Sequence, residues 1–77
     1  MPRRESDPAL RRFGENVRSL REKKDLSQEQ LAELADLDRT YIGGLERGER
    51  NATLASVIRV ARALGIKAAA LCEGIDR

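Results

Sequence analysis

The sequence predicts a single all-α domain built from five short helices. Apolar residues recur at spacings of three and four along most of the chain, which is the period of a helix with one buried face. The hydrophobic share is 40%, yet there is no Trp and only one Phe and one Tyr. A core of Leu, Ile, Val and Ala suits packed helices better than a β-sandwich. The 77 residues provide one small domain and are too few for a second core.

The first helix is expected to begin after Asp7-Pro8 and to end near Lys23-Lys24. Asp is a good N-cap, Pro fits the first helical position, and cations complement the carbonyl end of a helix. The expected apolar stripe consists of Leu10, Phe13, Val17 and Leu20. We therefore expect a flexible N-terminal tail over residues 1–7, a folded domain over residues 8–73 and a C-terminal tail over residues 74–77.

Two further short helices follow. Ser27 and Gln30 form a capping box that starts the second helix, which ends near Asp36, a residue that tolerates the left-handed conformation. Asp38 is expected to cap the third helix and Gly48 to close it. The expected inner faces consist of Leu31, Leu34 and Ala35 in the second helix and of Ile42 and Leu45 in the third.

The fourth helix is expected to begin after Thr53 and to end at Gly65. Its expected stripe consists of Leu54, Val57, Ile58, Ala61 and Leu64. A fifth short helix is expected over residues 67–73.

Catalytic and metal chemistry is sparse in this sequence. It contains no His and only one Cys, Cys72, which excludes a zinc site of the usual ligand spacing and a Ser–His or Cys–His nucleophile. Glu29 and Glu33 lie one helical turn apart, as on a solvated face. We therefore expect no enzyme, no cofactor and no small-molecule ligand. Without a secretory signal or a membrane-spanning run, the chain is expected to be cytoplasmic.

The charge balance favours an anionic partner if the basic residues gather on one side. The net charge is only +2, but the sequence pI is about 9.1. Mild basicity alone identifies no partner, so the motifs must carry the functional argument.

The second and third helices, expected over residues 27–35 and 38–47, have the spacing of a helix-turn-helix. Four runs in and after them resemble the lambda-repressor-like (XRE) helix-turn-helix family. The runs are Leu26-Ser27-Gln28-Glu29-Gln30-Leu31-Ala32, Leu37-Asp38-Arg39-Thr40-Tyr41-Ile42, Leu45-Glu46-Arg47-Gly48 and Arg50-Asn51. The resemblance covers roughly residues 13–71, and the second and last runs are most similar to the controller proteins of restriction–modification systems.

The resemblance implies a five-helix lambda-repressor-like DNA-binding domain. It implies a sequence-specific transcription regulator that binds a two-fold symmetric, double-stranded operator as a homodimer. A controller protein, a prophage-type repressor and an antitoxin that represses its own operon all fit this description. A protein-interaction module that does not bind DNA is the alternative of another class, and the polar trio of Gln28, Arg39 and Thr40 argues against it.

The third helix is expected to be the recognition helix. With Ile42 and Leu45 beneath it, Arg39, Thr40 and Gly43 face outward, where Arg39 can donate two hydrogen bonds to a guanine. The resemblance adds Gln28 as a phosphate clamp and further residues that contact the DNA backbone. The full expected set is Gln28, Arg39, Thr40, Tyr41, Gly43, Arg47, Arg50 and Asn51. Gly43 and Gly44 each weaken the helix by about 1 kcal/mol against Ala, and the sequence explains this for one of them at most.

Two further expectations concern structure and assembly. The resemblance implies a largely buried salt bridge between Arg21 and Glu46. The C-terminal part is more apolar than a small monomer needs, and small side chains allow close approach across a two-fold axis. The expected dimer interface consists of Ile66, Ala69, Ala70, Leu71 and Ile75.

Overall fold

The computed structural model describes residues 7–76, which form five α-helices and no strand. The predicted all-α fold class is therefore confirmed. The helices are α1 (Pro8–Lys23), α2 (Gln28–Ala35), α3 (Arg39–Glu46), α4 (Leu54–Leu64) and α5 (Ala68–Leu71). The expected N-terminal tail lies, apart from Asp7, outside the described residues, as does Arg77 of the expected C-terminal tail.

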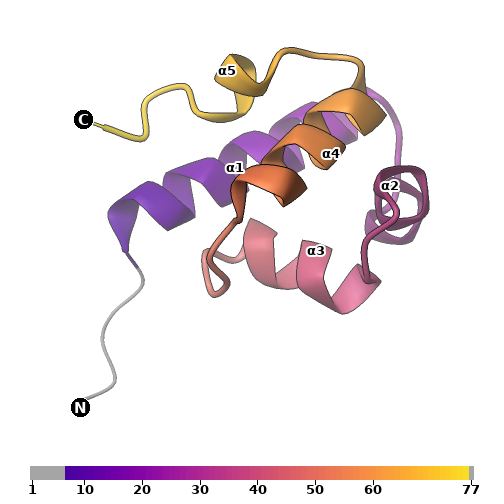
Figure 1. Ribbon diagram of the computed structural model, residues 1–77, viewed down its shortest axis with the longest axis horizontal. Coiled ribbons are helices and arrows are strands. Elements are labelled where there is room, and N and C mark those ends of the chain that lie inside the picture. The colour runs from indigo at the N-terminus through magenta and orange to yellow at the C-terminus, as the bar shows by residue number, and fades with distance from the viewer. Residues whose placement is uncertain (1–6, 77) are drawn as a thin grey trace.

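The arrangement places α3 against α1, with α2 packed on both α3 and α4, and α5 on α4 and α1 (Figure 1). Three of the four predicted side-chain caps are present, because Asp7, Ser27 and Thr53 each accept a hydrogen bond from a backbone N–H of the following turn. Asp36 adopts the left-handed conformation, with φ 58°, and so ends α2 as expected. Asp38 stands at the N-cap position of α3, but its side chain caps no backbone group.

The core is a single cluster to which all five helices contribute. It consists of Phe13, Val17, Leu31, Ala32, Ala35, Ile42, Leu45, Val60, Ala61, Leu64 and Leu71. Ala32 is one of the buried core residues that α2 contributes, at 4% exposure. No helix within residues 7–76 is both long enough and apolar enough to cross a membrane.

Two predicted core residues are exposed. Leu34 is 60% exposed, because α2 turns Leu31 and Ala35 toward the core and leaves Leu34 on the flank. Leu54 is 75% exposed, since it is the first residue of α4 and follows a polar loop that covers little of it. Val60, which the predicted stripe omitted, is fully buried instead. The fifth helix is also shorter than expected, with a single turn that ends at Leu71.

Helices α1 and α3 approach each other closely at Gly14. This residue is buried, and a β-carbon there would overlap the carbonyl oxygens of Leu45 and Glu46. Helix α1 therefore packs directly on the backbone at the C-terminal end of α3. The role of Gly14 could not be predicted from the sequence, because an isolated glycine in a helix carries no signal of the helix that packs against it.

Replacing Gly14 with Ala should separate α1 from α3 and lower the free energy of unfolding by about 1–3 kcal/mol, although Ala is the better helix former. Gly43→Ala is the matched control. A β-carbon at Gly43 lies nearest to Arg47 Nη1, at 3.1 Å, and that exposed side chain can move. Urea denaturation of both variants measures the difference. Equal losses in the two would contradict the packing described here.

Candidate nucleic-acid interface

A buried ion pair holds α3, the expected recognition helix, against α1. Arg21 Nε lies 2.6 Å from Glu46 Oε2, and Arg21 Nη2 lies 3.0 Å from Glu46 Oε1. Arg21 Nη1 also donates to the carbonyl of Leu26 at 2.7 Å. Both charged residues are buried, at 9% and 8% exposure. The flat guanidinium therefore fits a carboxylate at the end of α3 and a carbonyl before α2 at the same time.

The hydrogen bond to Glu46 raises the pKa of Arg21 above its ordinary value, while burial acts in the opposite direction. A basic group whose pKa is raised by folding stabilises the folded state while it is protonated. The contribution of Arg21 to the free energy of unfolding is therefore complete below its ordinary pKa and is lost only as the pH rises through the raised pKa. Arg21 therefore remains charged throughout the neutral range.

Gln28 joins the same junction from the first turn of α2. Its Nε2 donates to Glu46 Oε1 at 2.9 Å, so the Glu46 carboxylate connects α1, α2 and α3. The Gln28 side chain, which is expected to contact a phosphate, is therefore held in place by the carboxylate of Glu46. The first backbone N–H groups of any α-helix lack partners within the helix, and Gln28 stands beside those of α2.

Arg39 and Thr40 occupy the first turn of α3 and are exposed. Within residues 7–76, neither side chain forms a hydrogen bond or an ion pair. The two residues expected to read bases are thus presented to solvent by a helix that is fixed at its other end.

Gly43 lies differently from the expectation. It is buried rather than outward-facing, because the side chains of Arg47 and Gln28 cover it. Gly44 is covered in the same way by Arg50, whose Cγ a β-carbon at Gly44 would overlap. Both glycines in α3 therefore have a physical explanation, since they make room for arginine side chains that lie across the helix.

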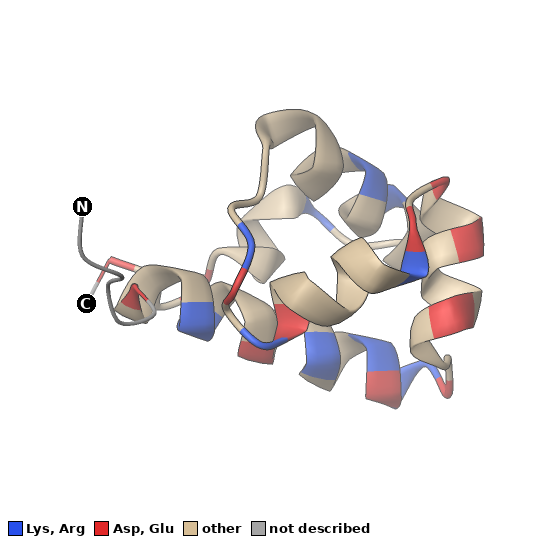
Figure 2. Cartoon of the chain, turned by 90° about the horizontal axis from the view of Figure 1, so that it is seen from below, with Lys and Arg blue, Asp and Glu red and all other residues tan. Residues whose placement is uncertain are grey.

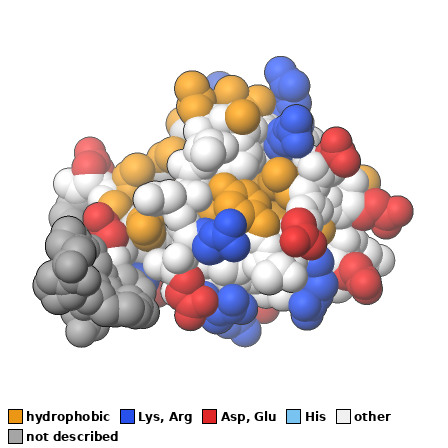
Figure 3. Space-filling view, turned by 60° about the horizontal axis from the view of Figure 1, so that its bottom comes forward, with side chains coloured by type: hydrophobic (Ala, Val, Ile, Leu, Met, Phe, Trp, Pro, Cys, Tyr) orange, Lys and Arg blue, Asp and Glu red, His pale blue; other side chains and the backbone are white. Residues whose placement is uncertain are grey.

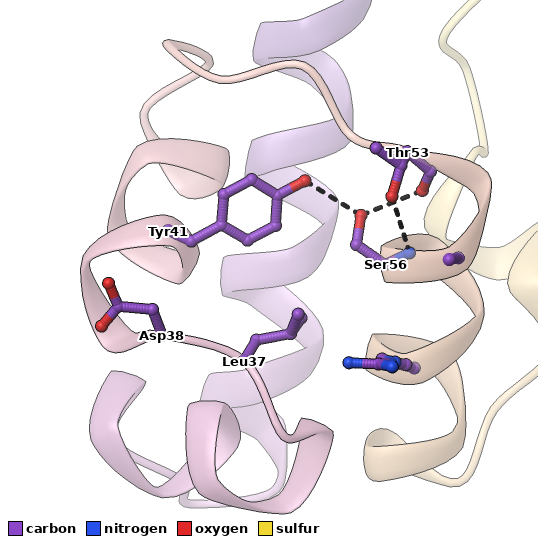
Figure 4. A pocket seen from close by; sticks show the side chains of 7 residues that line it. Leu37, Asp38, Tyr41, Thr53 and Ser56 are labelled. Atoms are coloured by element: carbon purple, nitrogen blue, oxygen red, sulfur yellow. Dashed lines mark hydrogen bonds between the residues drawn. The ribbon is translucent and has the colours of Figure 1, made fainter.

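Tyr41 connects α3 to the loop that follows it, at Asn51, and to the first turn of α4, at Ser56. Figure 4 shows the contact with Ser56. The Tyr41 hydroxyl donates to the carbonyl of Asn51 at 3.0 Å and lies 3.0 Å from the hydroxyl oxygen of Ser56. The guanidinium carbon of Arg50 lies 5.0 Å from the centre of the Tyr41 ring, within range for a cation–π interaction. Arg50 and Asn51 are therefore positioned by α3 even though they belong to a loop.

An open hollow lies beside Tyr41, between the turn before α3 and the start of α4 (Figure 4). It is lined by Leu37, Asp38, Tyr41, Thr53, Ala55, Ser56 and Arg59. This hollow could not be predicted from the sequence, because its walls come from three segments that only the packing of α4 brings together.

Charged side chains are partly segregated around this site. Arg47 and Arg50 are exposed on the loop that follows α3, where Arg47 Nε lies 3.0 Å from Glu49 Oε1. Helix α2 carries Glu29 and Glu33 and no basic residue. Figure 2 shows the acidic positions of α2 at one side and the arginine-bearing loop at another. Lys and Arg side chains also flank an apolar patch near the centre of the face in Figure 3.

The expected dimer residues divide into three groups by burial. Ala69 and Ala70 are exposed, and Ile66 and Ile75 are partly buried. Leu71 is fully buried and belongs to the core, so its assignment to the dimer interface is wrong. The reason is that α5 has a single turn packed on α4 and α1, and Leu71 is the residue that this turn directs inward.

A family model for helix-turn-helix domains, HTH_3, matches residues 17–71 of this chain. The control protein C.SmaI of Serratia marcescens is 60% identical over 52 residues, which cover 68% of this chain and 62% of that protein. The aligned region thus spans less than two thirds of the Serratia relative.

Two solved structures have the same fold. The restriction–modification controller protein C.AhdI from Aeromonas hydrophila superimposes with a TM-score of 0.80 and 50% identity, covering 80% of this chain and 94% of that one. The controller protein C.Esp1396I, solved as a tetramer in complex with its natural 35 base-pair operator, gives a TM-score of 0.78 and 32% identity. That match covers 88% of this chain and 90% of the other.

The buried pair supplies a stability prediction. Glu46→Ala leaves the guanidinium of Arg21 buried without its carboxylate and should lower the free energy of unfolding by about 3–5 kcal/mol. Glu22→Ala is the control, because the exposed Arg18–Glu22 pair contributes about 0.5 kcal/mol or less. Chemical denaturation measures the free energy of unfolding of both variants. Similar losses in the two would show that the buried Arg21–Glu46 pair stabilises the fold no more than an exposed pair does.

Proposed function

The chain belongs to the helix-turn-helix family, and from this premise we propose that it is a controller-type transcription regulator that binds operator DNA as a homodimer. One observation carries the proposal. Arg39 and Thr40 are exposed and unpartnered within residues 7–76, on a helix whose far end is fixed by the Arg21–Glu46 pair. A free base-reading surface on a rigid support is what direct readout in the major groove requires.

In this proposal Arg39 reads a guanine and Thr40 contacts an adjacent base edge or a thymine methyl group. An Arg side chain presents two donors that match guanine O6 and N7. Gly43 supplies space for Arg47 rather than a contact of its own.

A second group of residues would hold the DNA backbone and the groove edge. Gln28 would meet a phosphate next to the first N–H groups of α2. Arg47, Arg50, Tyr41 and Asn51 would contact the backbone where the loop approaches it. Two of these positions are already ordered by the Tyr41 ring and hydroxyl, which reduces the entropy lost on binding.

We assign the homodimer interface to the exposed side of α5 and to the partly buried residues beside it. That surface consists of Ile66, Ala69, Ala70 and Ile75. One recognition helix reads too few base pairs for operator affinity, whereas two helices about 34 Å apart read successive major grooves on one face of the DNA. The controller assignment follows the Serratia and Aeromonas relatives, and it places the protein in the cytoplasm with its operator.

Selection from a random double-stranded DNA library tests the function directly. The proposal expects enrichment of a two-fold symmetric sequence whose half-sites lie about one helical turn apart. Enrichment of a single asymmetric half-site would contradict the dimeric part of the proposal. No enrichment over the starting library would contradict DNA reading itself.

The enriched operator allows base reading to be separated from backbone holding. Arg39→Ala should relax the preference at one base position, at about 1–3 kcal/mol per half-site. Arg47→Ala should weaken all sequences more evenly and flatten the dependence of affinity on salt concentration. Titrations of matched and mismatched operators at several salt concentrations measure both effects. An unchanged specificity ratio in Arg39→Ala would show that another residue reads that base.

The dimer surface is tested at Ala70, which is exposed, rather than at Leu71, which the core needs. Ala70→Glu places a charge of the same sign on both sides of the two-fold axis and should shift the protein toward monomer. Ala55→Glu is the control, because it adds the same charge at an exposed position of α4. Sedimentation at micromolar concentration reports the state of each variant. A dimer that persists in Ala70→Glu would place the interface elsewhere.

A further inference from the structure

Three hydrogen bonds from α1 hold the backbone at the end of α5. Asn16 Nδ2 donates to the carbonyl of Leu71 at 2.8 Å and to that of Glu73 at 2.9 Å. Arg12 Nε donates to the same Glu73 carbonyl at 3.2 Å. We call Arg12, Asn16 and these two carbonyl groups the C-terminal clamp. Both N–H groups of the Asn16 amide are used, so this side chain matches the two acceptors fully.

Helix α5 depends on contacts of this kind. It has four residues, and its N-cap residue, Lys67, provides no side-chain cap. A helix of one turn is not stable by itself, and the carbonyl groups at its end have no partners within the helix. Leu71 anchors the turn in the core, and Ala68 and Cys72 pack against the same core as partly buried residues. These apolar contacts are not directional. The clamp supplies the bonds that fix the orientation.

The backbone after α5 passes close beneath Arg12. Gly74 has φ +80°, and a β-carbon there would lie 3.0 Å from Arg12 Nε and Nη2. A larger residue would be strained at this φ and would displace the guanidinium. The glycine therefore lets the chain turn where Arg12 can reach the Glu73 carbonyl.

Helix α1 also holds α3, the proposed recognition helix. Gly14, two residues before Asn16, is where α1 meets the backbone of α3. Arg21, five residues after Asn16, pairs with Glu46 at the end of α3. Helix α1 thus contacts both α3 and the end of α5, through Gly14 and Arg21 on one side and through Asn16 on the other. In a two-fold dimer that meets through α5, the distance and angle between the two α3 helices follow from this arrangement.

We propose that Arg12 and Asn16 are positioning residues that fix the half-site spacing the dimer reads, by setting the orientation of α5 relative to α3. This inference rests on the proposed homodimer. Neither residue needs to touch DNA or the partner subunit for this role. Loss of the clamp loosens the relation between the two recognition helices and leaves the reading of each half-site unchanged.

The test uses Asn16→Asp in the full chain. Asp has nearly the same shape, but its carboxylate cannot donate to the Leu71 and Glu73 carbonyl groups and repels them. Ser19→Asp is the control, because it adds the same charge at an exposed position of α1. Each protein is titrated with the symmetric operator obtained by selection and with versions that have one base pair inserted or removed at the centre.

The wild type and Ser19→Asp should prefer the selected spacing strongly. In Asn16→Asp that preference should fall by about tenfold, the scale expected when the two hydrogen bonds from Asn16 are lost. Self-association measured by sedimentation should weaken by a similar factor. The specificity ratio for bases within one half-site should stay at the wild-type value.

These readouts distinguish positioning from general stability. Partial unfolding lowers binding to every spacing equally, so a spacing ratio that stays at the wild-type value in Asn16→Asp overturns the proposal. If Asn16→Asp does not fold, Arg12→Ala serves instead, because it removes only the hydrogen bond to the Glu73 carbonyl. Arg12→Ala should weaken the preference for the selected spacing in the same direction. An unchanged spacing preference in this variant overturns the proposal. A wild type that is monomeric or reads all spacings equally contradicts the proposed homodimer, and this inference with it.

Discussion

The carboxylate of Glu46 is the junction on which the architecture of the site depends. It lies at the C-terminal end of α3, accepts two hydrogen bonds from Arg21 of α1 and a third from Gln28 of α2. An ion pair in a protein interior is stable only when its geometry is good and its remaining lone pairs are satisfied. Both conditions hold here, and no buried side-chain N or O atom of residues 7–76 is left without a partner. Helix α3, the proposed recognition helix, is thereby fixed at its C-terminal end, and the Arg39 and Thr40 side chains of its first turn remain exposed.

Two arginine side chains pack over the two glycines of α3. A helix with two adjacent glycines is intrinsically weakened by about 2 kcal/mol, so its stability must come from packing. The absence of β-carbons lets the side chains of Arg47 and Arg50 lie across Gly43 and Gly44. The Tyr41 ring then supports the Arg50 guanidinium, and the Tyr41 hydroxyl fixes the loop at Asn51. The helix therefore gives up intrinsic stability and gains an ordered rim of cations next to its exposed first turn.

Helix α1 connects this site to the C-terminal part of the domain. Its residues meet α3 at Gly14 and Arg21 and meet the end of α5 at Asn16. A small domain has little core to stabilise a terminal single-turn helix. Side-chain hydrogen bonds to backbone carbonyl groups provide what the core does not. The exposed alanines of α5 are consequently presented on a supported turn, as the proposed homodimer contact requires.

The sequence by itself determined the helices, the caps at Asp7, Ser27 and Thr53, the turn at Asp36 and the family to which the chain belongs. These features depend on local chemistry, namely helical periodicity, side-chain caps and a left-handed residue, and on runs of adjacent residues. The sequence placed Leu34 and Leu54 in the core, although both are exposed, and it placed Leu71 on the surface, although it is buried. It also left Gly14, the second glycine of α3 and the support of Arg50 by Tyr41 without explanation. Only the tertiary structure decided these points, because each depends on which neighbouring helix covers a given face, and that information lies in residues distant along the chain.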